Sequence, residues 1–567
     1  MPANYVAPRG RSPIGGTTHA YGMLSQTTSL AGSGIIGRHV QIASIHTMPH
    51  TLQRTPRILS SALVLVLSLF VPRMSSTQPA PDKAIQGVMN RPEFKHASWG
   101  MAFYDLDAGK LVAGVNTDRL FVPGSTTKLL TMATALEVMG ADHRFRTRVY
   151  RTGPVRNGVL EGDLVLRAAG DPNLSGRVRD GNRYAFVDRD HSYGGMPLDG
   201  DPLTTLKQLA QQVSNAGIRR ITGQVVVDAS LFPEGDRELG TRVTLSPMVV
   251  NDNVIDIVLT PGSKAGDRVT VQVLPATSYL TVHANLVTTD SATPLLVRSV
   301  EDSSSGDRRV IVATGSVPRG AAVNARWAVA SPRRFGEIVF TEVLNAAGIQ
   351  AVARLGARAT DSRTFAAFYT DSLMVAEHVS LPLTAEAVVL LKTSQNLHAS
   401  NFPLLLPTMA KASSGQNGFD MAREWLQREG LDTDGAQQGD GAGGDAMFSP
   451  LFMTQFLAMV AKKPWAEAFR TALPILGRDG TLALIQPNTP GAGKVFAKTG
   501  TYAKYDPLNR RTIVTGKGLA GYFTSRSGKR MAFALYVNNL AVKQGDPADV
   551  AGQALGEIAS LAWERLR

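Results

Sequence analysis

Pro123-Gly124-Ser125-Thr126-Thr127-Lys128-Leu129-Leu130 joins a turn to the start of a helix. A Pro-Gly pair favours a turn, and apolar residues at helical spacing predict a helix from Thr127 to Met139. Ser125 is therefore expected at the helix start, where the first backbone N–H groups have no partner within the helix. Lys128 follows three residues later, so its side chain shares a face with Ser125. The spacing thus brings a hydroxyl and an amine together.

This Ser-x-x-Lys pair contains the parts of a nucleophile and its base. A serine hydroxyl becomes a good nucleophile only when another group removes its proton. A lysine can remove it only while neutral, and burial beside other cations lowers the lysine pKa toward that state. A helix start adds the positive end of the helix dipole. Taken alone, Ser125-x-x-Lys128 also fits an N-capped surface helix, so the downstream motifs decide between the two interpretations.

Length and composition describe a multidomain globular protein. The 567 residues exceed one ordinary hydrophobic core, so about two or three domains are expected. A hydrophobic fraction of 43% with 19% charged residues is that of an ordinary globular protein. The absence of cysteine excludes disulfides and thiolate metal sites. A net charge of +13 suits an anionic polymer such as nucleic acid or cell wall, but no Lys/Arg cluster interleaved with aromatic residues supports nucleic acid.

The N-terminal region carries the pattern of an export signal. Residues 1–47 are rich in Gly, Ser and Thr, and are expected to be disordered or to lie upstream of a true translation start at Met48. Arg54 and Arg57 then precede the uncharged run Ile58–Val71, which is shorter than the roughly 20 residues that span a bilayer. Segment 48–81 is therefore predicted to be a signal peptide and linker, which places the protein in the periplasm or otherwise outside the cytoplasm. No clear cleavage motif follows, so an uncleaved anchor or peripheral membrane association stays open.

The pattern of the chain changes twice after the signal. Segment 82–145 contains a predicted hairpin followed by the Ser125 helix. From 146 to 370 short β-rich runs alternate with Gly, Pro and Asp turns, and a nested β module is expected near 245–325. Helical patterns return in 371–567. We therefore expect one domain built from 82–145 and 371–567, interrupted by inserted domains.

The insertion contains an internal repeat. Leu209–Val227 and Val339–Ala357 each predict a helix, a glycine that ends it, and a strand. The two terminating glycines are Gly217 and Gly348. The repeat predicts one α/β unit within the insertion.

The C-terminal part places two further motifs at element ends. A helix predicted over Leu383–Lys392 runs into Ser394-Gln395-Asn396, and a strand over Lys494–Thr501 ends in Lys498-Thr499-Gly500-Thr501. A hairpin and a closing amphipathic helix are predicted after them. With the first motif, the ordered set is Ser125-x-x-Lys128, Ser394-x-Asn396 and Lys498-Thr499-Gly500. Serine β-lactamases and penicillin-binding proteins share this trio.

Each member of the trio has a chemical task. Ser394 can pass a proton toward a leaving amine, and the Asn396 amide can hold both Lys128 and a substrate carbonyl. Lys498 supplies a cation that lowers the basicity of the neighbouring lysine and attracts a carboxylate.

The strand that carries Lys498 supplies the remaining groups. Thr499 and Thr501 can hydrogen-bond the carboxylate of a substrate, and Gly500 lacks a side chain, so a substrate can lie along the strand edge. The backbone N–H groups of Ser125 and Thr501 are expected to form an oxyanion hole.

Beyond the trio, longer matches make the sequence similar to one family. From about Ala97 to the C-terminus it resembles the class C low-molecular-mass penicillin-binding proteins, the D-alanyl-D-alanine carboxypeptidases and endopeptidases with a large insertion between the first two motifs. The matching stretches are Ala169-Gly170-Asp171-Pro172-Asn173-Leu174, Asp228-Ala229-Ser230-Leu231-Phe232, Asp479-Gly480-Thr481-Leu482, and Ala497-Lys498-Thr499-Gly500-Thr501 followed by Leu519-Ala520-Gly521-Tyr522.

The resemblance implies a fold and an activity. The fold class is α/β, more narrowly α+β: a transpeptidase-like antiparallel sheet between helix layers, with an inserted α/β and β-rich part. The implied activity is hydrolysis of peptidoglycan stem peptides through an acyl-enzyme at Ser125, without metal or cofactor, and with β-lactams as covalent inhibitors. Two departures affect loop geometry and substrate preference. The family often has Asp-Gly-Ser-Gly where this chain has Asp440-Gly441-Ala442-Gly443, and an Ala-Glu pair where Ala399 is followed by Ser400.

Other functional interpretations of the sequence have less support. His398 is near Ser394, but no Gly-x-Ser-x-Gly elbow accompanies it, so it is predicted to be a surface histidine. No His-Glu-x-x-His motif supports a zinc peptidase. A β-lactamase shares the trio, and a catalytically weak protein that only binds cell-wall peptides or β-lactams shares it too. The balance between carboxypeptidase and endopeptidase activity is left open by the sequence.

Overall fold

The structure is a computed structural model that describes residues 79–179, 183–293, 295–302, 309–352, 362–409 and 415–567. The predicted N-terminal extension 1–47 and nearly all of the predicted signal segment 48–81 lie outside the described residues. All described residues belong to one compact unit. None of the helices they form is long and apolar enough to cross a membrane.

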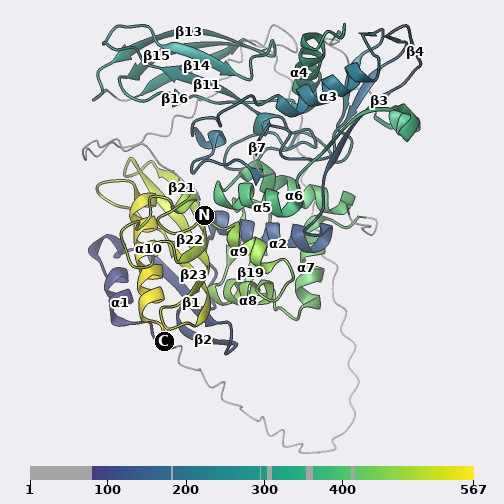
Figure 1. Cartoon of the computed structure of the whole chain (residues 1–567). Helices are drawn as coiled ribbons and strands as arrows, with labels where there is room; N and C mark the ends of the chain where they lie inside the picture. Colours follow the sequence, from purple (N-terminus) through teal and green to yellow (C-terminus); the bar gives the residue numbers. More distant parts are fainter. Residues whose placement is uncertain (1–78, 180–182, 294, 303–308, 353–361, 410–414) are drawn as a thin grey trace, which may run out of the picture. The chain divides into compact units, whose positions relative to one another are not determined.

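An antiparallel five-stranded sheet joins the two ends of the described chain (Figure 1). Its strand order is β2-β1-β23-β22-β21. The N-terminal part supplies β1 (Ser98–Asp105) and β2 (Lys110–Val115), and the C-terminal part supplies β21 (Val495–Asp506), β22 (Arg511–Thr524) and β23 (Arg530–Asn538). The predicted hairpins are present, and β1 pairs along its whole length with β23. The sheet therefore requires both ends of the chain.

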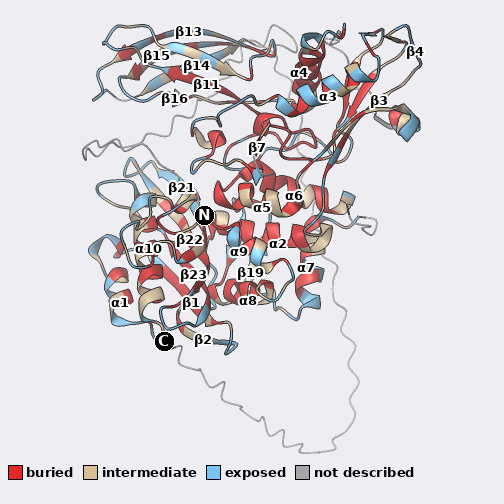
Figure 2. Ribbon diagram, viewed as in Figure 1, coloured by how far each residue is buried: buried red, intermediate tan, exposed pale blue. Residues whose placement is uncertain are grey.

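Side-chain alternation along β23 builds two cores, one on each face of this sheet. One core includes α1 (Lys83–Met89) and α10 (Pro547–Arg565), and the other includes α2 (Lys128–Met139) and α8 (Pro450–Val460) (Figure 2). Residues of β23 in the first core are Met531, Phe533, Leu535 and Val537. Those in the second are Ala532, Ala534 and Tyr536. The sheet therefore lies between helix layers, which confirms the predicted fold class.

The helix layer on the α2 side contains four more helices: α5 (Leu383–Lys392), α6 (Asn396–Met409), α7 (Gly418–Arg428) and α9 (Ala466–Thr471). The predicted bounds of α5 match those observed. Helix α6 was not predicted, because two prolines lie inside it and proline usually interrupts a helix. It begins at Asn396, so the second motif lies at the junction of two helices.

A mixed four-stranded sheet with the order β10-β6-β3-β18 forms part of the insertion. Its strands are β3 (Arg146–Arg151), β6 (Leu164–Arg167), β10 (Val225–Asp228) and β18 (Met374–Val379). Strand β18 pairs antiparallel with β3. The sequence pattern places the end of the insertion at residue 370. Strand β18 lies beyond that residue and pairs with β3, so the sheet extends to Val379.

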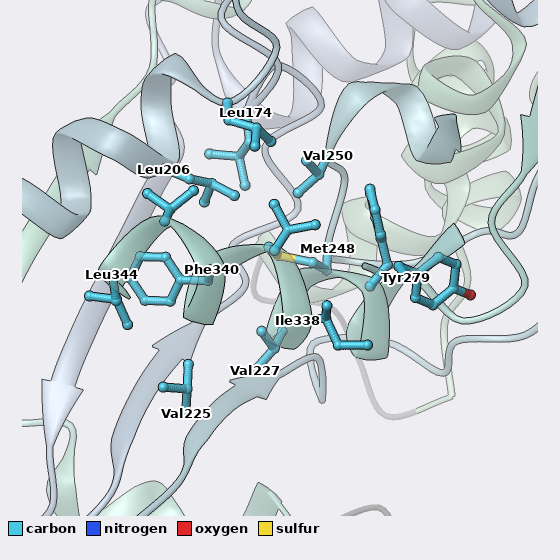
Figure 3. Packing of buried hydrophobic residues seen from close by; sticks show 14 of the residues in the cluster. Leu174, Leu206, Val225, Val227, Met248, Val250, Tyr279, Ile338, Phe340 and Leu344 are labelled. Carbon is cyan, nitrogen blue, oxygen red and sulfur yellow. The ribbon is translucent and has the colours of Figure 1, made fainter. Parts of the chain in front are cut away.

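Helices α3 (Thr204–Asn215) and α4 (Pro332–Ala346) pack with this sheet. Figure 3 shows Phe340 and Leu344 lying between Leu206 and the sheet residues Val225 and Val227. Both helices end as predicted at a glycine with positive φ, Gly217 at 83° and Gly348 at 81°. Part of the second repeat, residues 353–361, lies outside the described residues.

The longer of the remaining strands lie within residues 254–318. They include β11 (Val254–Thr260), β12 (Thr270–Leu274), β13 (Leu280–Thr289), β14 (Leu296–Asp302) and β15 (Arg309–Pro318). Strands β13, β15 and β14 form a three-stranded sheet. The short strands are β4 (Val155–Arg156), β5 (Val159–Leu160), β7 (Val178–Arg179), β8 (Arg183–Tyr184), β9 (Arg220–Ile221), β16 (Val323–Asn324), β17 (Trp327–Ala328), β19 (Ala436–Gln438) and β20 (Ala446–Phe448).

Candidate active site

Ser125 lies in a 3₁₀ turn, Gly124–Thr127, that leads directly into α2. The turn depends on Gly124, whose φ is 51°. A Cβ at Gly124 would lie 2.5 Å from the backbone nitrogen of Thr501, so no other residue fits between the turn and β21. The Thr127 hydroxyl donates to the Gly124 carbonyl at 2.9 Å and closes the turn. The local backbone therefore holds Ser125 against the strand that carries the third motif.

Lys128 is fully buried at the start of α2. Its Nζ donates to Ser125 Oγ at 2.7 Å, to Asn396 Oδ1 at 2.5 Å and to the carbonyl of Ala442 at 3.2 Å. The predicted contacts of Lys128 with the serine and with the Asn396 amide are thus present. Three acceptors around one ammonium fix the position of the amine relative to the hydroxyl.

Burial lowers the pKa of Lys128 to about 8, against the opposing charges of Glu238 and Asp440. A lower pKa increases the neutral fraction near neutral pH, and only the neutral amine can accept a proton. The sequence predicts this shift from burial beside other cations, with Lys498 as one of them. Burial is the larger cause here, because an ammonium without water is destabilised even before neighbouring charges act.

Ser394 and Lys498 form the second pair of the site. Lys498 is fully buried, and its Nζ donates to Ser394 Oγ and to the carbonyl of Thr499, both at 2.8 Å. Burial first, and then the charges of Lys128 and Lys517, hold the pKa of Lys498 well below its usual value. Ser394 has a φ of 64° in the junction between α5 and α6, and the hydroxyl of Tyr193 donates to its carbonyl at 2.8 Å. The insertion therefore supports this junction.

Within the part of the chain that the structure describes, the hydroxyls of Thr499 and Thr501 each have one hydrogen-bond partner. Thr499 Oγ1 donates to Thr481 Oγ1 at 2.7 Å, and Thr501 Oγ1 accepts from Lys517 Nζ at 2.8 Å. Lys517 was not singled out from the sequence, because it lies on β22 and reaches Thr501 only through strand pairing. It adds a second cation next to the predicted carboxylate site.

Gly500 is required for a different reason from the predicted one. A Cβ there would lie 2.0 Å from the carbonyl oxygen of Pro123 and 2.9 Å from the nitrogen of Ser125. The glycine therefore makes room for the Ser125 turn rather than for a substrate. Strand β21 is still the last strand of its sheet among the described residues. The segment around Ile475 pairs with its outer edge up to Ala497, so within the described residues an added strand can pair with that edge only beyond Ala497.

The loop that begins at Asp440 closes the site from another side. The Asp440 carboxylate accepts from the backbone nitrogens of Gly443 at 2.7 Å and Gly444 at 3.0 Å. A Cβ at Gly443 would lie 2.1 Å from the Gly124 carbonyl oxygen, so the loop packs directly on the Ser125 turn. Ala442 contacts Lys128 through its carbonyl. The alanine at this position therefore keeps the backbone contact that a serine would also make.

Glu238 of the insertion lies beside Asn396 in the site, and the sequence analysis does not predict it. It is 2% exposed, and its Oε1 accepts from Asn396 Nδ2 at 2.7 Å. No local pattern marks it, because it belongs to no motif and lies far from the trio along the chain. Only the packing of the insertion against the Ser394–Asn396 junction reveals it.

The prediction that His398 is a surface histidine is wrong, because the side chain is completely buried. Its Nδ1 lies 2.9 Å from Glu386 Oε1 and its Nε2 lies 3.0 Å from Asp252 Oδ1. Burial alone would lower its pKa, but the two carboxylates raise it to about 9. Both ring nitrogens are therefore engaged, and neither is available as a base for a serine.

One group of side chains in the described residues has the spacing of a metal site. Ligand atoms of Asp190, His191 and Asp252 lie within 4.8 Å of one another. The guanidinium of Arg177 contacts both carboxylates, and Gln395 Nε2 donates to Asp190 at 2.9 Å. A cation is thus already present between these acids, and the cluster is better described as a buried ionic network.

A protein-family model described as the D-Ala-D-Ala carboxypeptidase 3 (S13) family matches residues 82–558. The chain belongs to the S13 family. This membership confirms the predicted family and enzyme class: the protein is a serine-type D-Ala-D-Ala carboxypeptidase, a hydrolase of peptidoglycan peptides. The match includes both parts of the trio-bearing domain and the insertion between them.

Curated relatives of this S13 protein span most of its length. It is 27% identical to a D-alanyl-D-alanine carboxypeptidase of Actinomadura sp., over 80% of each chain. It is 23% identical to D-alanyl-D-alanine carboxypeptidase DacB of Haemophilus influenzae, over 77% of this chain and 85% of the relative.

A solved structure shares the fold of this S13 protein. Penicillin binding protein 4 from Haemophilus influenzae matches with a TM-score of 0.63 at 20% identity, over 85% of this chain and 99% of the other. Its complex with a novel β-lactam matches with a TM-score of 0.61 at 19% identity, over the same shares. At these identities the likeness establishes the fold, and the roles of individual residues rest on the geometry above.

Proposed function

We propose that Ser125 is the acylated nucleophile of this S13 carboxypeptidase and that Lys128 is its base. The 2.7 Å hydrogen bond between Lys128 Nζ and Ser125 Oγ, with the amine fully buried, carries the proposal. Oγ attacks the carbonyl of the penultimate D-alanine while its proton passes to Nζ. The C–N bond then breaks, and the leaving amine receives a proton through Ser394. Water hydrolyses the resulting ester and releases the shortened peptide.

The third motif binds the substrate in this mechanism. Lys498, Thr499 and Thr501 hold the carboxylate of the leaving residue, and the backbone N–H groups of Ser125 and Thr501 hold the oxyanion. The close packing of the Ser125 turn on β21 at Gly500 supports this pairing of N–H groups. Both a terminal D-alanine and a cross-linked D-centre with a free carboxylate fit the same site, so carboxypeptidase and endopeptidase activities use one pocket.

β-Lactams are proposed to acylate the same serine. The structurally similar Haemophilus influenzae protein forms a complex with a β-lactam. In this chain the lactam carbonyl would take the place of the peptide carbonyl, and the strained amide bond would open on attack by Ser125. The product is a covalent ester that blocks the site.

Intact-mass analysis with a penicillin tests the assignment. The wild-type protein should gain the mass of one penicillin, and Ser125→Ala should gain none. Ser527→Ala, in the turn between β22 and β23, is the matched control and should be labelled like the wild type. D-Alanine release from a synthetic pentapeptide and cleavage of dimeric muropeptides are measured on the same samples. Full labelling of Ser125→Ala would reject the nucleophile, and labelling without either product would leave a penicillin-binding protein without peptidase turnover.

The protein is further proposed to act outside the cytoplasm, in the periplasm or an equivalent compartment. The support is the run Ile58–Val71 behind Arg54 and Arg57, in the predicted signal 48–81. An uncleaved segment would leave the enzyme associated with the membrane. A fusion of residues 48–80 to a reporter should be exported, and Leu65→Arg in the same fusion should prevent export because a charge interrupts the apolar run. Cytoplasmic retention of the unchanged fusion would contradict the proposal.

A further inference from the structure

The insertion contributes one carboxylate to the catalytic centre, that of Glu238. Besides Asn396, this carboxylate accepts from the backbone nitrogen of Gly240 at 2.7 Å, from the backbone nitrogen of Thr241, and from Thr241 Oγ1 at 2.6 Å. Four donors around one buried carboxylate hold it in a single orientation. Glu238 is therefore a rigid acceptor rather than a side chain that can follow its neighbours.

The amide of Asn396 lies between this carboxylate and the amine of Lys128. An amide has one donor end and one acceptor end. Its Nδ2 donates to Glu238 Oε1 at 2.7 Å, so its Oδ1 faces Lys128 Nζ at 2.5 Å. A carboxylate can only accept hydrogen bonds, so it cannot pair with the amide oxygen that a flipped Asn396 side chain would turn toward it. The flipped amide would direct N–H groups at the lysine, so the amine would lose Asn396 as an acceptor and keep only Ser125 Oγ and the Ala442 carbonyl.

We propose that Glu238 is a positioning residue of the catalytic centre: it orients the Asn396 amide and, through that amide, the amine of Lys128. The inference rests on the proposed role of Lys128 as the base. One N–H of Asn396 is used by Glu238, which leaves the second for the substrate carbonyl. The large insertion is thus part of the active site and not only an appended domain.

The charge of Glu238 also affects the pKa of Lys128, and this effect can be measured separately from the orientation of the Asn396 amide. Lys128 faces Glu238, Asp440 and Lys498, and the first two raise its pKa against the larger effect of burial. Glu238 itself also faces Tyr193 and Arg326. Removal of its charge should therefore lower the pKa of Lys128 while it also releases the amide. A merely structural role would lower the rate without moving the pH dependence.

Gly240 offers a variant that keeps the charge. A Cβ at this position would lie 2.7 Å from Asn396 Nδ2 and 3.2 Å from Glu238 Oε1. The change Gly240→Ala should therefore displace the amide and lower kcat/KM. The acid limb of the pH profile should stay nearly in place, because no charge is lost.

The experiment is the pH profile of kcat/KM for D-alanine release, from pH 5 to 10, in the full-length protein. Glu238→Gln should lower the plateau about tenfold or more, the size of a lost hydrogen bond to a charged group. It should also move the acid limb downward by about one pH unit, the scale of one close charge in a buried site. Glu238→Asp keeps the charge and should restore the position of the limb with part of the rate.

Glu234→Gln is the matched control. Glu234 belongs to the same segment and accepts from Ser246 and from the backbone of Arg333, without contact to Asn396. Its variant should leave the limb where the wild type has it. A Glu238→Gln profile like that of the wild type, or one that loses rate with an unmoved limb, overturns the inference.

Penicillin labelling separates this outcome from a failure of the proposed function. If Ser125→Ala is still labelled, the nucleophile assignment fails whatever Glu238 does. If the wild type is labelled at Ser125 and Glu238→Gln keeps the wild-type profile, only the role of Glu238 is refuted.

Discussion

At the residue scale, Ser125 and Lys128 combine two requirements that oppose each other. An amine next to a hydroxyl is useful as a base only when it is neutral, yet the hydrogen bonds that position it favour the charged form. Burial lowers the pKa of Lys128 to about 8 and so outweighs the carboxylates of Glu238 and Asp440. The result is an amine that is positioned by three acceptors and still loses its proton near physiological pH.

This balance predicts a pH dependence for acylation. The rate of β-lactam acylation should rise about tenfold per pH unit on the acid side and level off above pH 8, because only neutral Lys128 accepts the proton. Lys128→Arg should abolish acylation at every pH, since a guanidinium keeps its proton. Stopped-flow acylation with a chromogenic cephalosporin measures both. The exposed Lys494→Arg is the control and should retain the wild-type profile, whereas acylation by Lys128→Arg at the wild-type rate would refute the base assignment.

At the scale of elements, the junction between α5 and α6 is held by the insertion. Gln395, the middle residue of the second motif, donates to Asp190 at 2.9 Å and to Asp252 at 3.3 Å. His398, one turn into α6, bridges Asp252 and Glu386. The buried ionic network therefore joins two helices of the catalytic part to the start of β11. Its charged groups are buried, so they depend on one another for compensation.

The network predicts that stability falls at alkaline pH. The folded-state pKa of His398 is about 9, above its ordinary value of 6.5. The charged histidine therefore stabilises the fold fully below pH 6.5, and this contribution disappears as the pH rises through 9. Urea unfolding should show a loss on the order of 1–3 kcal/mol between pH 6.5 and pH 9.5, as expected for a pKa shift of this kind.

Two variants test whether His398 causes this decrease of the unfolding free energy with pH. His398→Gln should be less stable at pH 6.5 and should show a flatter decline, because the titrating group is gone. His96→Gln, at an exposed histidine, should decline like the wild type. An unchanged slope in His398→Gln would show that this histidine is not the group responsible.

At the scale of the whole molecule, the two ends of the insertion meet. The nitrogen of Ser380 donates to the carbonyl of Phe145 at 2.9 Å, and the nitrogen of Phe145 donates to Ser380 Oγ at 2.9 Å. A large segment can be inserted there without separating β1 from β23, because the chain returns to the point where it left. All residues of the core in Figure 3 belong to this segment, between Val149 and Ala376.

These contacts predict that the insertion is a folding unit with a boundary near residue 379. A fragment of residues 146–379 should unfold cooperatively on heating, as followed by circular dichroism, because it retains its own core. The matched fragment 146–370 lacks β18 and should melt at a lower temperature, since β3 loses a strand partner. A fragment 146–379 without a cooperative transition would contradict independent folding.

Local spacing was sufficient for the catalytic motifs and for most of the elements that carry them. Ser125 and Lys128 are one helical turn apart, and Ser394 and Asn396 flank one residue, so their proximity within each motif follows from backbone geometry. The same holds for β1, β22 and β23, whose alternating residues mark two covered faces. Helix α6 is not predicted from the sequence, because it contains two prolines and proline usually interrupts a helix.

The contacts between distant parts of the chain could be found only in the folded molecule. Glu238 and Lys517 belong to no motif, and their partners Asn396 and Thr501 become neighbours through the packing of the insertion and the pairing of β21 with β22. Burial is equally non-local: His398 looks like a polar surface residue in the sequence and is buried because the segments that carry Asp252 and Glu386 close around it. The pKa of Lys128 depends on both distant contacts and burial, because the exclusion of water that lowers it is a property of the assembled site.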